Sequence, residues 1–130
     1  MAKIGGEQDV VAAIVATGDP HALLAAMGEC ARLAREHSAL RLLFRDESIP
    51  WICRPEAACR VATVIVVDDD LSVLLDELAS APEARLYACS SSLYLWGATA
   101  ADLRPGLSGA RGLIAFLAED VAPAARVLSF

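Results

Sequence analysis

Cysteine is the residue type in this 130-residue sequence best suited to nucleophilic chemistry, and there are four: Cys30, Cys53, Cys59 and Cys89. Cys89 follows a β-forming segment, Arg85–Ala88, and precedes three serines and a helix-forming segment, Leu93–Trp96. A thiol between a strand and a helix faces free backbone N–H groups and the positive end of the helix dipole, which both favour the thiolate. This position predicts Cys89 as a nucleophile, but it is equally consistent with a small buried apolar residue.

The residues after Cys89 exclude two well-known catalytic loops. A phosphatase-type Cys-x5-Arg loop needs arginine at position 95, where the sequence has Leu95. A thioredoxin-type Cys-x-x-Cys motif needs cysteine at position 92, where the sequence has Ser92. A glycine-rich phosphate loop is not predicted either, because Gly5-Gly6 precedes the first expected strand instead of following it.

The remaining cysteines and a triple aspartate are weaker candidates. Cys53 and Cys59 are candidates to resolve an oxidised Cys89 or to bind a metal, but their five intervening residues match no strong zinc spacing. Cys30 lies on the apolar face of an expected helix and is predicted to be core. Asp68–Asp70 fits a strand end and a helix cap better than a magnesium site. We therefore predict no metal and no cofactor.

Strand-forming and helix-forming segments alternate along the chain. The expected strands are Val10–Ala16, Leu40–Phe44, Val61–Val67, Arg85–Ala88 and Arg126–Phe130. The expected helices cover residues 20–37, 71–79, 93–96 and 108–120, with a helical turn near residues 50–53. Such alternation favours parallel pairing. The sequence thus predicts a flexible N-terminal tail over residues 1–9 and a single α/β domain over residues 10–130. This domain is expected to be flavodoxin-like, with a mainly parallel five-stranded sheet and helices on both faces.

In parallel sheets the ligand site lies outside the carboxyl ends of the strands, so residues directly after the strands should share one rim. Asp19 and Asp46 follow the first and second expected strands, and Ser90 and Ser91 follow Cys89. We predict these four residues as a supporting rim around the cysteine.

Composition limits the partners and the compartment. The net charge is −6 and Lys3 is the only lysine, which argues against direct nucleic-acid binding. Hydrophobic residues make up 56% of the chain, which favours apolar burial between subunits and hence a homo-oligomer. No signal-peptide pattern or bilayer-spanning apolar run is visible, so we expect a cytoplasmic protein with reduced thiols and no membrane partner.

Two parts of the sequence resemble the DsrE/DsrF-like sulfur-relay family. The first is the cysteine loop, Leu86-Tyr87-Ala88-Cys89-Ser90-Ser91-Ser92-Leu93-Tyr94-Leu95-Trp96-Gly97. The second is the tail, where Leu103 to Gly106 lead to Gly112-Leu113 and a closing strand over Ala125–Phe130. The first strand and its Gly18-Asp19-Pro20 turn fit more loosely, and the pair of Cys53 and Cys59 departs from the family pattern.

The resemblance implies a small α/β protein that assembles into dimers, trimers or hexamers. It also implies a cysteine, Cys89 by position, that carries persulfide sulfur between donor and acceptor proteins. The leading hypothesis is therefore a sulfur carrier, a possible sulfurtransferase. Two alternatives stay open: a non-enzymatic oligomeric binding module with structural cysteines, and a metal-binding or redox-sensing protein that uses Cys53 and Cys59 with Cys89.

Overall fold

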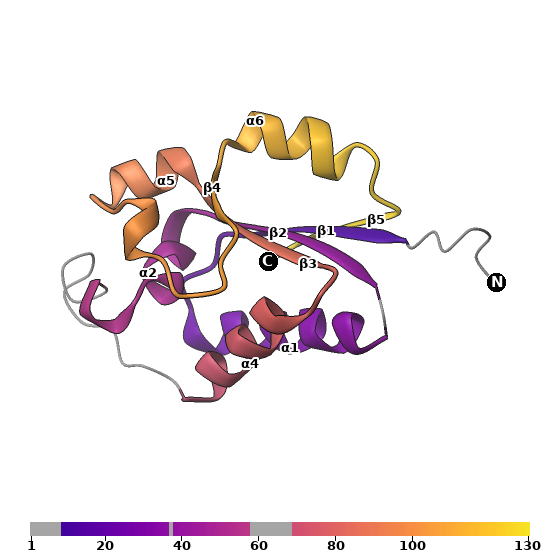
Figure 1. Ribbon diagram of the computed structural model, residues 1–130, viewed down its shortest axis with the longest axis horizontal. Coiled ribbons are helices and arrows are strands. Elements are labelled where there is room, and N and C mark those ends of the chain that lie inside the picture. The colour runs from indigo at the N-terminus through magenta and orange to yellow at the C-terminus, as the bar shows by residue number, and fades with distance from the viewer. Residues whose placement is uncertain (1–8, 37, 58–68) are drawn as a thin grey trace.

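A computed structural model describes residues 9–36, 38–57 and 69–130, and its centre is a five-stranded sheet in which every pairing is parallel (Figure 1). The strands lie in the order β4-β3-β2-β1-β5. Their bounds are Val10–Val15 (β1), Ala39–Phe44 (β2), Ala84–Cys89 (β3), Gly109–Arg111 (β4) and Arg126–Ser129 (β5). The predicted single α/β domain with a five-stranded parallel sheet is confirmed.

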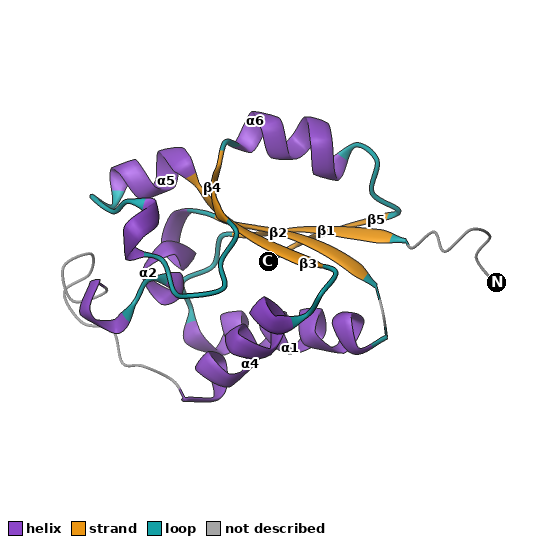
Figure 2. Ribbon diagram, in the orientation of Figure 1, coloured by secondary structure: helices purple, strands orange, loops and turns teal. Residues whose placement is uncertain are grey.

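Helices cover both faces of the sheet, as the sequence predicted (Figure 2). Their bounds are Pro20–Arg35 (α1), Ile49–Ile52 (α2), Asp69–Ser80 (α4), Ser90–Leu95 (α5) and Leu113–Phe116 (α6). Two 3-10 turns, η2 over Asp46–Ser48 and η3 over Ala100–Asp102, lie in the connections. A π-helical segment, η4 over Leu117–Val121, continues α6. The chain therefore forms three layers, with α1 and α4 below the sheet in Figure 1 and α6 above it.

One strand differs from its predicted structure. The predicted helix over residues 108–120 is wrong at its start, because Gly109–Arg111 pairs with β3 as strand β4 and the helix begins only at Leu113. Gly109 has a φ of 106°, which L-residues in a helix do not adopt, and Gly112 is extended. The predicted strand Val61–Val67 lies outside the described residues.

The sheet face that α1 and α4 cover contains the main core. Alternate residues of β1, β2 and β3 point toward these two helices, as the period of a strand requires. The largest of its fully buried side chains include Leu23, Met27, Leu40, Leu42, Phe44 and Leu75. Cys30 is among the buried residues, which confirms its predicted place in the core.

The opposite face, beneath α6, has a much smaller apolar cluster. Its fully buried members are Ala12, Leu43, Cys89 and Phe116, with Tyr87 and Leu113 among the partly buried residues packed against them. Because β4 and β5 are at opposite edges of the sheet, the segment that joins them, α6 and η4, crosses this face. The side chain of Cys89 therefore lies between the sheet and α6.

Two further predictions concern the ends of the chain and membranes. Most of the predicted tail, residues 1–9, lies outside the described residues; the carbonyl of Asp9 accepts a hydrogen bond from the Ala39 N–H at 3.2 Å. In the part of the chain that the structure describes, no helix combines the length and the apolar character needed to cross a bilayer.

Candidate functional site

Cys89 is the point where a strand passes directly into a helix. It is the last residue of β3 and the N-cap of α5, with an extended backbone (φ −63°, ψ 123°). No side-chain hydrogen bond caps α5. The N–H groups of its first turn therefore remain available to the cysteine, which is the N-cap residue. Gly97, with a φ of 69°, ends this short helix in the left-handed conformation that glycine adopts readily.

The serines after Cys89 surround its sulfur with hydrogen-bond donors. The Ser91 Oγ lies 3.3 Å from the Cys89 Sγ. Burial raises the pKa of Cys89, but the hydroxyl of Ser91, the backbone N–H and hydroxyl of Ser92 and the backbone N–H of Ser91 lower it. The net result is a pKa below that of an ordinary thiol.

The surroundings of the other two described cysteines raise the pKa of their thiols. Burial raises the pKa of Cys30 to about 12, with a further contribution from the charge of Glu29. Burial raises the pKa of Cys53 to about 11, with Asp102 adding to the rise and Arg104 opposing it. Cys89 is thus the one cysteine of the described chain that its surroundings prepare for ionisation.

Access to the Cys89 sulfur is restricted. The residue is 1% exposed and packs with Ala12, Leu43 and Phe116. The neighbouring Ser90 and Ser91 are exposed. The sulfur therefore meets a reagent only when side chains at α5 or α6 move, whereas the donors that stabilise its anion are already in place.

The turn after β2 is linked to the cysteine through Ser92. The Asp46 N–H donates to the Ser92 Oγ at 3.0 Å, and the Ser92 hydroxyl is one of the groups that lower the pKa of Cys89. Since the hydroxyl accepts from Asp46, its own proton remains available for the sulfur. The chain of contacts runs from Asp46 through Ser92 to Cys89.

The backbone of Asp46 is in an uncommon conformation that this turn holds in place. Its φ is 52°, in the left-handed region that aspartate tolerates better than most residues. The Trp96 Nε1–H donates to the Asp46 carbonyl at 2.8 Å, and the Ser48 Oγ lies 2.8 Å from the carbonyl oxygens of Val15 and Arg45. These bonds fix the direction of the Asp46 N–H toward Ser92.

The turns after β1 and β2 touch each other closely. A Cβ atom on Gly18 would lie 2.7 Å from the Cβ of Glu47, so only glycine allows this approach. Asp19 caps α1, accepting at its Oδ2 the N–H of Ala22 at 2.8 Å, and the Trp51 indole N–H donates to the Gly18 carbonyl at 3.2 Å. The loops after β1, β2 and β3 therefore share one rim.

The predicted rim residues contribute unequally to the surroundings of Cys89. Ser91 contacts the sulfur, and Asp46 reaches it through Ser92. Ser90 is exposed and makes no hydrogen bond to the sulfur, and Asp19 acts as a helix cap. The structure thus brings Asp46 and Ser91 into the neighbourhood of Cys89 and gives Asp19 a local role in α1.

Cys53 does not lie beside Cys89 in the described chain. Cys53 is 2% exposed, belongs to the core on the α1 and α4 side, and forms an antiparallel bridge with Leu103. Cys59 lies outside the described residues. Among the residues that are described, no three His, Cys, Asp or Glu side chains gather closely enough to hold a metal ion.

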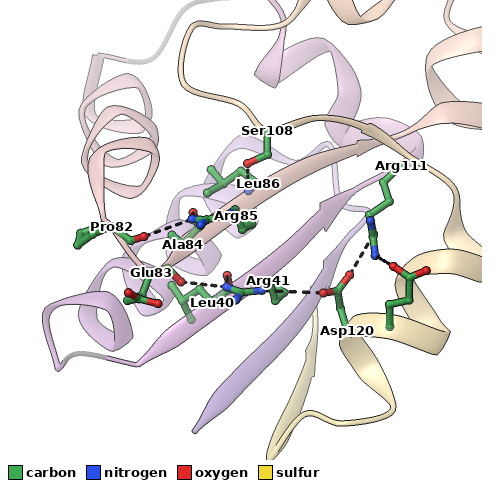
Figure 3. A network of polar contacts seen from close by, with 11 residues as sticks. Leu40, Arg41, Pro82, Glu83, Ala84, Arg85, Leu86, Ser108, Arg111 and Asp120 are labelled. Atoms are coloured by element: carbon green, nitrogen blue, oxygen red, sulfur yellow. Dashed lines mark hydrogen bonds and ion pairs between the residues drawn. The ribbon is translucent and has the colours of Figure 1, made fainter. Parts of the chain in front are cut away.

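A network of charges crosses the sheet from Arg41 in β2 to Arg111 at the carboxyl end of β4 (Figure 3). Arg111, the register partner of Cys89 on β4, pairs with Asp120 at 3.0 Å and with Glu119, and its guanidinium lies 5.0 Å from the Tyr87 ring centroid. Arg41 lies 3.9 Å from Asp120. Because its carboxylate partners neutralise Arg111, this arginine fastens η4 to the sheet instead of stabilising the Cys89 thiolate.

Sequence analysis missed three contributors to this site. Ser92 was considered only as a small residue of the loop, although its place three residues after an N-cap predicts a group near the cap. No local signal in the sequence indicates the bond of Trp96 to Asp46. Arg111 was assigned to a helix, so its place beside Cys89 on β4 could not be foreseen.

No protein-family model matches this chain, and no curated protein matches it either. Its fold is shared with solved structures. The crystal structure of the YchN protein from E. coli matches with a TM-score of 0.74 and 17% identity, over 95% of this chain and 100% of that chain. MTH1491, a protein of unknown function from Methanobacterium thermoautotrophicum, matches with a TM-score of 0.62 and 19% identity, over 94% of this chain and 99% of that chain. At these identities the likeness shows that this chain has the same α/β fold as both proteins.

Proposed function

We propose that this protein is a sulfur carrier of the DsrE/DsrF-like kind, in which Cys89 holds sulfur as a persulfide and passes it to an acceptor. The observation that carries the proposal is the contrast among the described thiols. Serine and backbone donors lower the pKa of Cys89, while burial raises the pKa of Cys30 to about 12 and of Cys53 to about 11. The resemblance of the cysteine loop to that family supports the same assignment.

The chemistry is two successive thiol exchanges that need no external oxidant. In loading, the Cys89 thiolate attacks the outer sulfur of a donor persulfide, a new S–S bond forms, and the donor leaves as a thiolate. In delivery, an acceptor thiolate attacks the outer sulfur now on Cys89, which leaves as a thiolate. Ser91 and Ser92 assist both steps, because they stabilise the Cys89 anion first as nucleophile and then as leaving group.

Intact-mass measurement after incubation with a persulfide donor tests the carrier function. The wild type should gain one sulfur atom, and Cys89→Ser should gain none. Cys30→Ser, Cys53→Ser and Cys59→Ser are the matched controls, and each should load as the wild type does. Undiminished loading of Cys89→Ser would contradict the proposal.

One observation favours a second function, a binding module whose cysteines are structural. Cys89 is 1% exposed and packs with apolar residues, as structural cysteines do. The two functions differ in alkylation kinetics under native conditions. A carrier should be alkylated at Cys89 much faster than the protein unfolds globally, whereas a structural cysteine should react only at the rate of global unfolding.

We further propose a cytoplasmic homo-oligomer that exchanges sulfur with donor and acceptor proteins and does not itself bind nucleic acid. Large apolar side chains are exposed on α6 and β5, on the Cys89 side of the sheet: Ile114 and Val127. Such a surface favours contact with another protein chain. Light scattering at micromolar concentration should give a mass well above the 13.7 kDa of one chain, and a monomer would contradict the oligomer.

A further inference from the structure

A cavity of about 300 Å³ lies beside α5, and the sulfur chemistry above does not use it. Its lining consists of Asp46, Glu47, Ser92, Leu95 and Trp96. Asp46 and Glu47 come from η2, while the other three residues come from α5 and its C-cap. The cavity thus joins an acidic wall to a wall with an aromatic and an aliphatic side chain, and this lining can hold a cation whose stem is apolar.

The charge on the acidic wall is only partly neutralised. The Asp46 carboxylate pairs with the Arg45 Nε at 3.2 Å. Within residues 9–36, 38–57 and 69–130, no basic side chain lies within ion-pair distance of Glu47, whose side chain is exposed. A cation that enters the cavity therefore finds a carboxylate without an ion-pair partner among the described residues and a neighbouring indole, and both attract positive charge.

The two walls are fixed relative to each other before any ligand binds. The Trp96 indole N–H donates to the Asp46 carbonyl at 2.8 Å, and the Asp46 N–H donates to the Ser92 Oγ at 3.0 Å. A preformed cavity reduces the ordering cost of binding.

We propose that this cavity binds a cationic side chain, a guanidinium or ammonium group, presented by a partner protein. A protein source fits the surroundings, because Leu95 is 81% exposed and the adjacent Tyr94 is 83% exposed. A polypeptide on either side of the basic residue would cover both side chains, whereas a small free cation would leave them in water. Since Ser92 contacts both the cavity and Cys89, the bound segment would lie next to the sulfur.

NMR titration of the full chain tests this site without sulfur loading, so its outcome is separate from that of the carrier function. The chain has two tryptophans, and Trp51→Phe assigns the two indole N–H signals. N-acetyl-arginine N-methylamide should shift the Trp96 signal saturably, with much less change at Trp51. The citrulline analogue, which has the same shape without the charge, should not. The blocked peptide Ala-Leu-Arg-Leu-Ala should bind more tightly than the amino-acid probe.

Matched variants locate the binding site. Glu47→Gln should weaken binding by about two- to five-fold, the range for one solvent-exposed ion pair. Glu83→Gln removes the same charge at the amino end of β3 and should leave binding unchanged. Equal shifts with arginine and citrulline probes, or unchanged binding by Glu47→Gln, would overturn the cation site. Equal affinity for the peptide and the amino-acid probe would overturn the protein partner in favour of a small free cation.

Discussion

The two faces of the sheet differ in how much apolar side chain covers them. On the face that α1 and α4 cover, a continuous core buries side chains from both helices and from β1, β2 and β3. On the face that α6 covers, only four residues of the cluster in the described chain are fully buried, and large apolar side chains such as Ile114 remain exposed. The first face holds the fold together, and the second leaves surface available for partners.

The cysteines on the two faces also differ, in the pKa of their thiols. Cys30 and Cys53 lie in the large core, where burial dominates and raises the pKa of each. Cys89 lies in the small cluster at the end of its strand, where serine and backbone donors outweigh burial. The comparison teaches that burial of a cysteine does not by itself decide its reactivity. The polar groups within hydrogen-bond distance of the sulfur decide it.

The largest effect we expect is the loss of stability when a side chain of the large core is truncated, compared with a truncation on the α6 side of the sheet. Leu42→Ala removes a fully buried side chain of the large core and should lower the free energy of unfolding by about 2–5 kcal/mol. Under dilute conditions in which the chain is monomeric, Ile114→Ala truncates a residue that is 81% exposed and should change it by less than about 0.5 kcal/mol. Urea unfolding measures both. A large cost for Ile114→Ala at higher protein concentration would mean that a second protein chain covers α6.

The next effect is alkaline destabilisation that originates in the large core. The pKa of Cys53 is about 11 and that of Cys30 about 12 in the folded chain, against 9.0 for an ordinary thiol. Between pH 9 and 11 the unfolded chain therefore releases these protons while the folded chain keeps them, so stability falls as the pH rises. Each thiol should contribute a slope of about 1.4 kcal/mol per pH unit.

Comparison of unfolding curves at several pH values isolates this contribution. The double variant Cys30→Ala/Cys53→Ala should lose stability less steeply than the wild type above pH 9, although it starts from a lower value because two buried side chains are truncated. Parallel slopes in the two proteins would show that these thiols are not protected in the folded chain.

A smaller effect is expected at Cys89. Ser91→Ala removes the hydroxyl that lies 3.3 Å from the Sγ, and Ser90→Ala is the matched control because its exposed hydroxyl makes no such contact. Loss of one hydrogen bond, about 0.5–1.5 kcal/mol, should reduce the thiolate fraction and the alkylation rate at neutral pH by about two- to ten-fold. Equal rates for the two variants would remove Ser91 from the site.

The sequence predicted most of the fold because the strongest signals are local. Val10–Val15 is an uninterrupted apolar run between polar segments, and Asp19 with Pro20 marks the start of α1 by its capping chemistry. The exception is β4, whose three residues, Gly109–Arg111, have no β propensity. They form a strand because the free edge of β3 offers unpaired backbone groups, and only the three-dimensional arrangement reveals this edge.

The site was predictable to the extent that chain order defines it. The place of Cys89 between strand and helix follows from adjacent residues, as does the approach of Ser91 two positions later. The contact of Asp46 with Ser92 spans 46 positions, and that of Trp96 with Asp46 spans 50. These contacts depend on which strands are neighbours in the sheet. The sequence therefore indicated the rim but not the bonds that link its loops.

The smallest effect concerns Asp46, and it separates the contribution of a side chain from that of a backbone. Asp46→Asn removes the ion pair with Arg45, which is exposed and worth about 0.2–1 kcal/mol. Asparagine tolerates the left-handed φ of 52° as well as aspartate does, so the N–H should still donate to Ser92. The alkylation rate of Cys89 should then stay near that of the wild type.

Asp46→Pro is the contrasting variant, because proline has no N–H and holds φ near −65°. It should lower the alkylation rate of Cys89, since the Ser92 hydroxyl loses the donor that orients it. Circular dichroism and urea unfolding check that the variant still folds. If Asp46→Asn slows Cys89 as much as Asp46→Pro does, the carboxylate and not the backbone acts on the thiol. In that case the cysteines on the two faces of the sheet would differ in reactivity because of the Asp46 charge, as well as because of the backbone contact that links Asp46, Ser92 and Cys89.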